Sequence, residues 1–107
     1  MTQEIRDAVT FIETHYTSPI KASDAAAITG YSYHHFMRKF RAETGRTFFD
    51  VISELRVKFA CQLLQESSLD MQDVSRLSGF NSLVQFHRVF KALTGMTPMR
   101  YRVEYYS

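Results

Sequence analysis

One stretch of the sequence is repeated: residues 30–47 resemble residues 79–97 when one inserted residue is allowed in the second copy. From the shared serine onward, the identical pairs are Ser32/Ser82, Phe36/Phe86, Arg38/Arg88, Phe40/Phe90, Ala42/Ala92, Thr44/Thr94, Gly45/Gly95 and Thr47/Thr97. Two unrelated segments would rarely agree at so many positions. The chain is therefore expected to use one structural unit twice.

Each copy follows a short helical pattern that ends at a glycine. The glycines are Gly30 and Gly79, and the small residues four positions before them are Ala26 and Ser75. Glycine readily adopts the left-handed conformation that ends a helix, and the serine that follows is a typical N-cap. Two helices joined by a tight turn, with a small residue where they cross, form a helix-turn-helix. The second helix of this motif typically enters the major groove of DNA.

Three further helices are predicted outside the two motifs. The first is capped by Thr2, ends before Ser18–Pro19 and carries Ile5, Ala8, Val9, Ile12 and Tyr16 on one face. The second opens with Thr47 and Asp50 in a capping-box pattern, runs to about Glu66 and carries Ile52, Leu55, Phe59 and Leu63 on one face. The third is short and begins at Thr97–Pro98.

These elements predict an all-α fold of about seven helices without a strand. Two helix-turn-helix subdomains, 1–47 and 67–107, are expected to flank a linker helix at 48–66. Each subdomain is too small to bury much core alone, so a helix shared by both makes physical sense.

Composition narrows the class of protein. The 107 residues contain no apolar run long enough to span a bilayer and no signal-peptide pattern at the start, which predicts a cytoplasmic protein without a membrane partner. A lone Cys61 agrees with this compartment, and its apolar surroundings predict a small core residue. The net charge of +2 is too small to indicate a nucleic acid by itself.

The distribution of charge is more informative than its sum. The first copy contains Arg38, Lys39, Arg41 and Arg46 against Glu43 alone, and residues 81–102 contain Arg88, Lys91, Arg100 and Arg102 without an acid. Basic residues that recur with a repeat are expected on a surface that faces phosphate, whereas a solvated helix face is the simpler alternative.

Helical periodicity sorts the residues of the two second helices. The inward residues are Phe36 and Phe40 in the first copy, and Phe86, Val89, Phe90 and Leu93 in the second. The outward residues are His34, Arg38 and Arg41, flanked by His35 and Met37, and Val84, Arg88 and Lys91, flanked by Gln85 and His87. The phenylalanines are therefore expected in the core, and the outward and flanking residues are the candidates for DNA contact.

Arg38 and Arg88 are the strongest candidates for reading bases, because an arginine in the major groove can donate two hydrogen bonds to guanine. A phosphate contact or an exposed ion pair is the simpler reading of each. Gln85 is suited to adenine and Val84 to a thymine methyl group. Candidates for contact with phosphate are Ser32, Ser82, Asn81, Arg46 and the first turns of the helices near Ala22 and Met71.

Catalysis and metal binding lack a sequence basis. His34 and His35 diverge by about 100° on a helix, and Cys61 has no partner with zinc spacing. No catalytic triad, phosphate loop or pair of carboxylates is recognisable. The sequence therefore predicts neither an enzyme nor a cofactor, metal or small-molecule site.

The residues of the second copy closely resemble the signature of the AraC/XylS family of bacterial transcription regulators. They are Gly79-Phe80-Asn81-Ser82, Phe86-His87-Arg88-Val89-Phe90-Lys91, Thr94-Gly95-Met96-Thr97-Pro98 and Tyr101-Arg102. The first copy matches in Gly30-Tyr31-Ser32, Phe36, Arg38, Phe40 and Glu43-Thr44-Gly45, and Leu55-Arg56, Ala60 and Leu63-Leu64 match in the helix that follows. The resemblance covers essentially the whole chain.

The resemblance implies a monomer that binds an asymmetric site on double-stranded DNA, bends it, and contacts RNA polymerase to activate transcription. It places base reading on His34, Met37 and Arg38, and on Val84, Gln85, His87 and Arg88. It also implies either a stand-alone, abundance-controlled regulator associated with the nucleoid or the C-terminal domain of a longer member. Two readings stay open beside it: a helix-turn-helix that binds an acidic protein, and a DNA-bending protein without sequence preference.

Four residues depart from the pattern of the family: Lys21, Ser75 and, on the two second helices, His34 and Val84, which differ from the residues common in its best-known stand-alone members. Lys21 stands where a capping residue is usual, whereas Asp70 caps the counterpart helix. The helix that begins at Ala22 is therefore expected to fray. Ser75 replaces the usual alanine at the crossing of the two helices, a small change that the crossing should tolerate.

Overall fold

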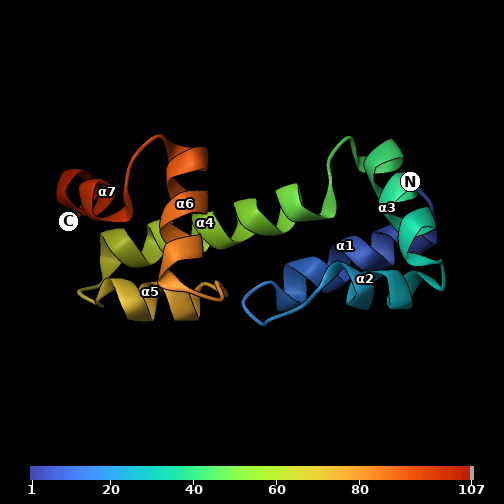
Figure 1. Ribbon diagram of the computed structural model, residues 1–107, viewed down its shortest axis with the longest axis horizontal. Helices are drawn as coiled ribbons and strands as arrows, with labels where there is room; N and C mark the ends of the chain where they lie inside the picture. Colours follow the sequence, from blue (N-terminus) through green and yellow to red (C-terminus); the bar gives the residue numbers. More distant parts are fainter. Residues whose placement is uncertain (107) are drawn as a thin grey trace. The chain divides into compact units, whose positions relative to one another are not determined.

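The computed structural model describes residues 1–106, which form seven α-helices and no strand, as predicted. They are α1 (Gln3–His15), α2 (Ala22–Thr29), α3 (Tyr33–Thr44), α4 (Phe48–Glu66), α5 (Met71–Leu77), α6 (Leu83–Thr94) and α7 (Pro98–Tyr105) (Figure 1). The chain divides into two compact units, the first ending at Ser53 and the second beginning at Glu54. The boundary lies inside α4, so this helix begins in one unit and ends in the other.

In the first unit, α1 packs against α2 and α3. Its apolar stripe supplies three fully buried side chains, Ile5, Ala8 and Ile12, which meet a core that includes Ala25, Phe36 and Phe40. Thr2 caps α1 as predicted, because its hydroxyl accepts a hydrogen bond from the Ile5 N–H at 3.4 Å.

The core of the second unit is built from α4, α5, α6 and the turn between the last two. Its buried side chains are Val57, Ala60, Leu64, Val74, Phe80, Phe86 and Phe90. Tyr101 of α7 packs on this cluster edge-on to Phe90, with ring centroids 5.5 Å apart. Cys61 lies half-buried against the same cluster, and burial raises the pKa of its thiol. This is the environment of a structural cysteine, as the sequence predicted.

The apolar face of α4 differs from the predicted one. Leu55, Phe59 and Leu63 are only half-buried, whereas Val57, Ala60 and Leu64 are buried. Of the predicted face, Ile52 alone is buried, and it lies in the first unit. Because the helix contributes to two cores, its buried residues do not follow one stripe along its length.

One other local prediction was wrong. Leu93 was expected to point inward, yet its side chain is 49% exposed. It matches Glu43 of the first copy, which contacts the start of α1, and no helix equivalent to α1 covers it in the second unit. At the start of α2, the Lys21 side chain forms no cap, as expected, but the Asp24 carboxylate accepts the Lys21 N–H at 2.7 Å.

Within residues 1–106, no helix combines the length and the apolar character that crossing a membrane requires. The longest helix, α4, has 19 residues and several charged side chains.

Candidate nucleic-acid interface

Both predicted helix-turn-helix motifs are present, one formed by α2 and α3 and the other by α5 and α6. Gly30 and Gly79 adopt φ angles of 76° and 98°, a region that side chains rarely occupy. The serine hydroxyls then cap the second helices as predicted: Ser32 Oγ accepts the N–H of His35, and Ser82 Oγ accepts the N–H of Gln85.

The small residues at the two helix crossings are buried, as predicted. Ala26 is 4% exposed and Ser75 is 3% exposed. The structure also explains why serine is accepted in the second motif. Ser75 Oγ donates a hydrogen bond to the carbonyl oxygen of Ser82 at 3.3 Å, so the buried hydroxyl is paired and ties α5 to the start of α6.

Both second helices end in the same hydroxyl-centred turn. Thr44 Oγ donates to the Phe40 carbonyl at 2.7 Å and accepts the Arg46 N–H at 3.2 Å. Thr94 makes the equivalent bonds to Phe90 and Met96, at 2.8 and 3.2 Å. The threonine-glycine pair shared by the two copies thus stops each helix at the same place and sets the direction of the chain that follows.

On α3, the candidate contact residues face solvent. His34, His35, Arg38 and Arg41 are exposed and Met37 is half-buried, whereas Phe36 and Phe40 are fully buried. The ring of His35 lies on that of Tyr31, with centroids 4.4 Å apart. The predicted inward and outward faces are therefore correct, and His35 is held over the start of the helix.

Glu43 joins the end of α3 to the start of α1. Its Oε1 accepts the N–H of Thr2 at 2.6 Å, and its Oε2 lies 3.2 Å from the ammonium group of Lys39. The hydrogen bond from Thr2 is the main cause that holds the pKa of Glu43 below its ordinary value. The bond to Glu43 in turn raises the pKa of Lys39. These contacts orient α3 on the first unit and engage Lys39 internally.

On α6, Val84, Arg88 and Lys91 are exposed, and Val84 is 78% exposed. An apolar side chain that projects so far from a recognition helix is suited to an apolar contact in a groove, such as a thymine methyl group. Gln85 and His87 are half-buried on the flanks of this row, as their positions predicted.

The two flanking residues of α6 are anchored to their own backbone. Gln85 Oε1 accepts the N–H of Asn81 at 2.9 Å. His87 Nδ1 lies 2.8 Å from the Leu83 carbonyl oxygen, which can only accept, so Nδ1 carries the proton in this contact. The other ring nitrogen of His87 is then the one that can meet a ligand. Sequence reasoning missed both anchors, because they depend on side-chain conformation.

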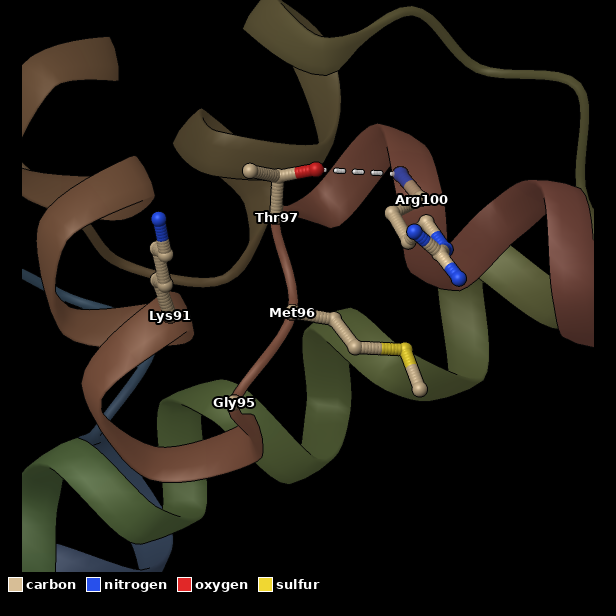
Figure 2. A pocket seen from close by; sticks show the side chains of 5 residues that line it. All are labelled: Lys91, Gly95, Met96, Thr97 and Arg100. Atoms are coloured by element: carbon tan, nitrogen blue, oxygen red, sulfur yellow. Dashed lines mark hydrogen bonds between the residues drawn. The ribbon is translucent and has the colours of Figure 1, made fainter.

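A shallow pocket of about 400 Å³ lies where α6 ends and α7 begins (Figure 2). It is lined by Lys91, Gly95, Met96, Thr97 and Arg100, and the Thr97 hydroxyl accepts the Arg100 N–H at 3.2 Å. Arg100 also pairs with Glu104 at 2.8 Å. Arg100 belongs to the basic stretch of the second copy but was not among the predicted contact residues. The signal that could have found it is its place in the first turn after the Thr97 cap.

The candidate phosphate contacts lie in different environments. The hydroxyls of Ser32 and Ser82 already accept helix N–H groups, and Arg46 is half-buried near Asp50. Hydrogen bonds from Thr47 lower the pKa of Asp50, and the charges of Arg46 and Arg41 lower it further. Met71 is the first residue of α5, whose N-terminus carries the carboxylates of Asp70 and Asp73. These charges make the start of α5 a poor place for phosphate.

Arg102 lies in the basic stretch of the second copy, but its guanidinium binds backbone groups of its own unit. Its guanidinium donates to the carbonyl oxygens of Leu64, Ser67 and Leu69, at 3.2, 3.1 and 2.5 Å. These carbonyls belong to the last turn of α4 and to the loop before α5. Arg102 is half-buried and ties α7 to these carbonyls within the second unit, a role that its place in the basic stretch did not predict.

No group of three or more histidine, cysteine or acidic side chains within residues 1–106 is placed to hold a metal ion. What the described surface offers is two exposed helices with arginines at matching positions, each held by a cap at its start and a turn at its end.

The chain matches the family of helix-turn-helix domains over residues 25–104. It is 34% identical over 87 residues to the HTH-type transcriptional regulator GlxA of Rhizobium meliloti, covering 81% of this chain and 27% of that protein. It is 29% identical over 92 residues to the MmsAB operon regulatory protein of Pseudomonas aeruginosa, covering 86% of this chain and 30% of that protein. The chain thus spans less than a third of the length of these two relatives.

A solved structure with the same fold is the DNA-binding domain of AdpA, a global transcriptional factor, in complex with a target DNA. It is 27% identical, with a TM-score of 0.89 that covers 97% of this chain and 94% of that one. The family match spans most of the chain, and the two motifs that define the family are both present. The chain therefore belongs to the AraC-type helix-turn-helix family.

Proposed function

We propose that this protein is a sequence-specific DNA-binding transcription regulator whose helices α3 and α6 each read a segment of the major groove. The observation that carries the proposal is that both copies of the motif have an exposed arginine at the same position of the second helix. These residues are Arg38 and Arg88. An arginine at the centre of such a helix can donate two hydrogen bonds to guanine. The DNA complex of the AdpA domain, which has the same fold, supports binding to DNA.

The remaining contacts divide into base reading and positioning. On α3, His34, His35 and Met37 lie beside Arg38, and on α6, Val84, Gln85 and His87 lie beside Arg88. Arg41 and Lys91 lie farther along the two helices, where contact with phosphate rather than bases is expected. Ser32, Asn81, Ser82 and Arg46 complete the phosphate contacts, whereas Met71 contributes least because of the acids beside it.

The wider role follows from the family. We expect a monomer that uses both motifs on one asymmetric site, bends the DNA, and activates transcription through contact with RNA polymerase. Such a protein acts in the bacterial cytoplasm on the chromosome. The proposal involves no cofactor and no catalytic step. The linker role of α4, between subdomains at 1–47 and 67–107, belongs to the same proposal.

Selection of the protein on a random duplex library near physiological salt tests the proposal without knowledge of the target. Enrichment of an asymmetric motif with two boxes about one helical turn apart is the expected result. Enrichment of a single box would contradict the use of both motifs. Binding without enrichment would replace the proposal by a DNA-bending protein without sequence preference, and failure to bind would favour an acidic protein as the partner.

A further inference from the structure

We propose that Gln85 reads DNA with only one side of its amide group. In this proposal its Oε1 stays on the N–H of Asn81, and its amide NH₂ donates to the keto oxygen of guanine or thymine. The inference rests on the proposed function and deepens it, because it assigns the kind of base edge that this residue selects. It replaces the adenine preference expected from the sequence.

The orientation of the amide follows from its partner. The N–H of Asn81 can only donate, so the Gln85 atom that lies 2.9 Å from it must be the oxygen. Adenine is read by an amide that uses both sides, since the oxygen accepts from N6 and the nitrogen donates to N7. Gln85 has only its nitrogen free for this purpose while the bond to Asn81 persists.

The bond to Asn81 has a structural reason to persist on DNA. It works like a capping box shifted by one residue: Ser82 Oγ accepts the N–H of Gln85, and Gln85 Oε1 accepts the N–H of Asn81, the residue before the cap, in place of that of Ser82. If the start of the helix is covered by DNA, breaking the bond would leave the N–H of Asn81 without water or a side-chain acceptor. Keeping the cap and donating through the NH₂ avoids that loss.

The first motif lacks this device. The residue that matches Gln85 is His35, whose ring packs on Tyr31. The side chain at this position is therefore fixed differently in the two motifs. The His35 ring packs on Tyr31 in the first, and the Gln85 amide oxygen accepts a backbone hydrogen bond in the second. Only in the second does the anchor leave a group that is purely a donor. The edges that present acceptors without a neighbouring donor are those of thymine, through O4, and guanine, through O6 and N7, whereas adenine places the N6 donor beside its N7 acceptor.

Two variants separate the cap from the contact with the base. Gln85→Glu keeps an oxygen for the N–H of Asn81 but has no NH₂, whereas Gln85→Met has a similar length and neither group. The wild type and both variants are compared by thermal unfolding and by selection on the random duplex library, with preferences expressed as ratios between sequences. Ratios remove the uniform loss of affinity that the added negative charge causes.

The wild type is expected to prefer guanine or thymine over the alternatives at one position of the second box by about fivefold or more. Gln85→Glu is expected to keep the wild-type Tm and lose that preference. Gln85→Met is expected to lose the preference and unfold at a lower temperature. If Gln85→Glu unfolds at as low a temperature as Gln85→Met, or if it retains the preference, the proposal is wrong.

A position occupied by a T·A pair needs one more measurement, because thymine and adenine lie in the same pair. Replacing that adenine by 7-deazaadenine removes N7 and leaves thymine O4 intact. Unchanged wild-type affinity supports the contact with thymine, and a loss that Gln85→Glu does not show would place the NH₂ on N7 of adenine and overturn the proposal. A wild type that enriches no motif contradicts the proposed function and this role with it. A wild-type motif that both variants leave unchanged contradicts only the role of Gln85.

Discussion

At the scale of single residues, side chains of one type can either stabilise the fold or remain exposed for binding. The contacts of each side chain distinguish the two roles. Arg38 and Arg88 are exposed on their helices, whereas Arg102 is turned toward three carbonyl oxygens of its own unit. Glu43, an acid within a basic stretch, is occupied by the start of α1 and by Lys39. The charge of a residue type therefore does not reveal its role until its contacts are known.

Arg38→Ala and Arg88→Ala are each expected to relax sequence preference in a different box of the target. The loss is about 1–3 kcal/mol of discrimination at the base pair that each arginine contacts, because two hydrogen bonds to guanine disappear. Binding to a panel of single-base-pair variants of the selected site measures this effect. Retention of the wild-type preference at every position by both variants would refute the assignment.

Glu43→Gln is expected to lower the Tm at neutral pH and to make stability less dependent on pH in acid. The folded state lowers the pKa of Glu43 below 4.5, chiefly through the N–H of Thr2, so it favours the carboxylate. The contribution of this carboxylate is present above pH 4.5 and is lost as the pH falls through the lowered value. The Tm gap between wild type and variant should therefore narrow below pH 4.5. A gap that stays constant from pH 7 to pH 3 would show that the charge of Glu43 does not contribute.

At the scale of elements, the two motifs place α3 and α6 by the same three devices: a small residue at the crossing, a serine cap and a threonine turn. The crossing is the tightest of these, since Ala26 and Ser75 are almost fully buried. The second crossing also carries a hydrogen bond from Ser75 to the start of α6, which the first cannot form. The placement of each reading helix thus depends on the volume of one side chain.

Ser75→Leu is expected to destabilise the protein by about 1–3 kcal/mol, because the added carbons must displace α5 from α6. Ser75→Ala is the matched control and should cost less than about 1 kcal/mol, since it removes one hydrogen bond without adding volume. The Ser82 carbonyl keeps its bond from the Phe86 N–H. Urea denaturation of both variants measures these values. Similar losses for the two variants would argue that the hydrogen bond, and not the volume, matters at this crossing.

At the scale of the whole molecule, basic residues outnumber acidic ones by only two, 13 against 11, yet the basic side chains are not equivalent. Lys91 is exposed in the last turn of α6, and it and Arg100 both line the pocket drawn in Figure 2. Arg102 is two residues after Arg100, but its guanidinium is hydrogen-bonded to backbone carbonyls of the second unit. The part of the charge that can meet phosphate is therefore smaller than the sequence suggests.

Lys91→Ala and Arg102→Ala are expected to separate these two kinds of charge. Lys91→Ala should weaken binding evenly across sequences and reduce the slope of log affinity against log salt by about 0.9, the value for one phosphate contact. Arg102→Ala should lower stability by about 1.5–3 kcal/mol, because charged hydrogen bonds to three carbonyls are lost, and leave the slope unchanged. Both slopes are measured at a temperature at which the variants are folded. A reduced slope for Arg102→Ala would place this residue on DNA after all.

Local patterns predicted most of the secondary structure. Glycine at positive φ, serine and threonine caps and the proline at the start of α7 act over a few residues, so they can be recognised in the sequence. The same holds for the inward and outward faces of α3 and α6, where buried phenylalanines alternate with exposed arginines. The face of α4 and the exposure of Leu93 were not predictable in this way, because both depend on which other helices are present.

The sequence by itself determined that one helix-turn-helix is used twice, and which residues of each second helix face away from the core. The reason is that repetition, caps and helical periodicity are properties of near neighbours in the chain. Only the tertiary structure decided that Arg102 turns inward, that Glu43 holds α1, and that the oxygen of Gln85 is engaged. Two of these contacts join residues far apart in sequence and the third depends on the conformation of one side chain, so packing in three dimensions selects them.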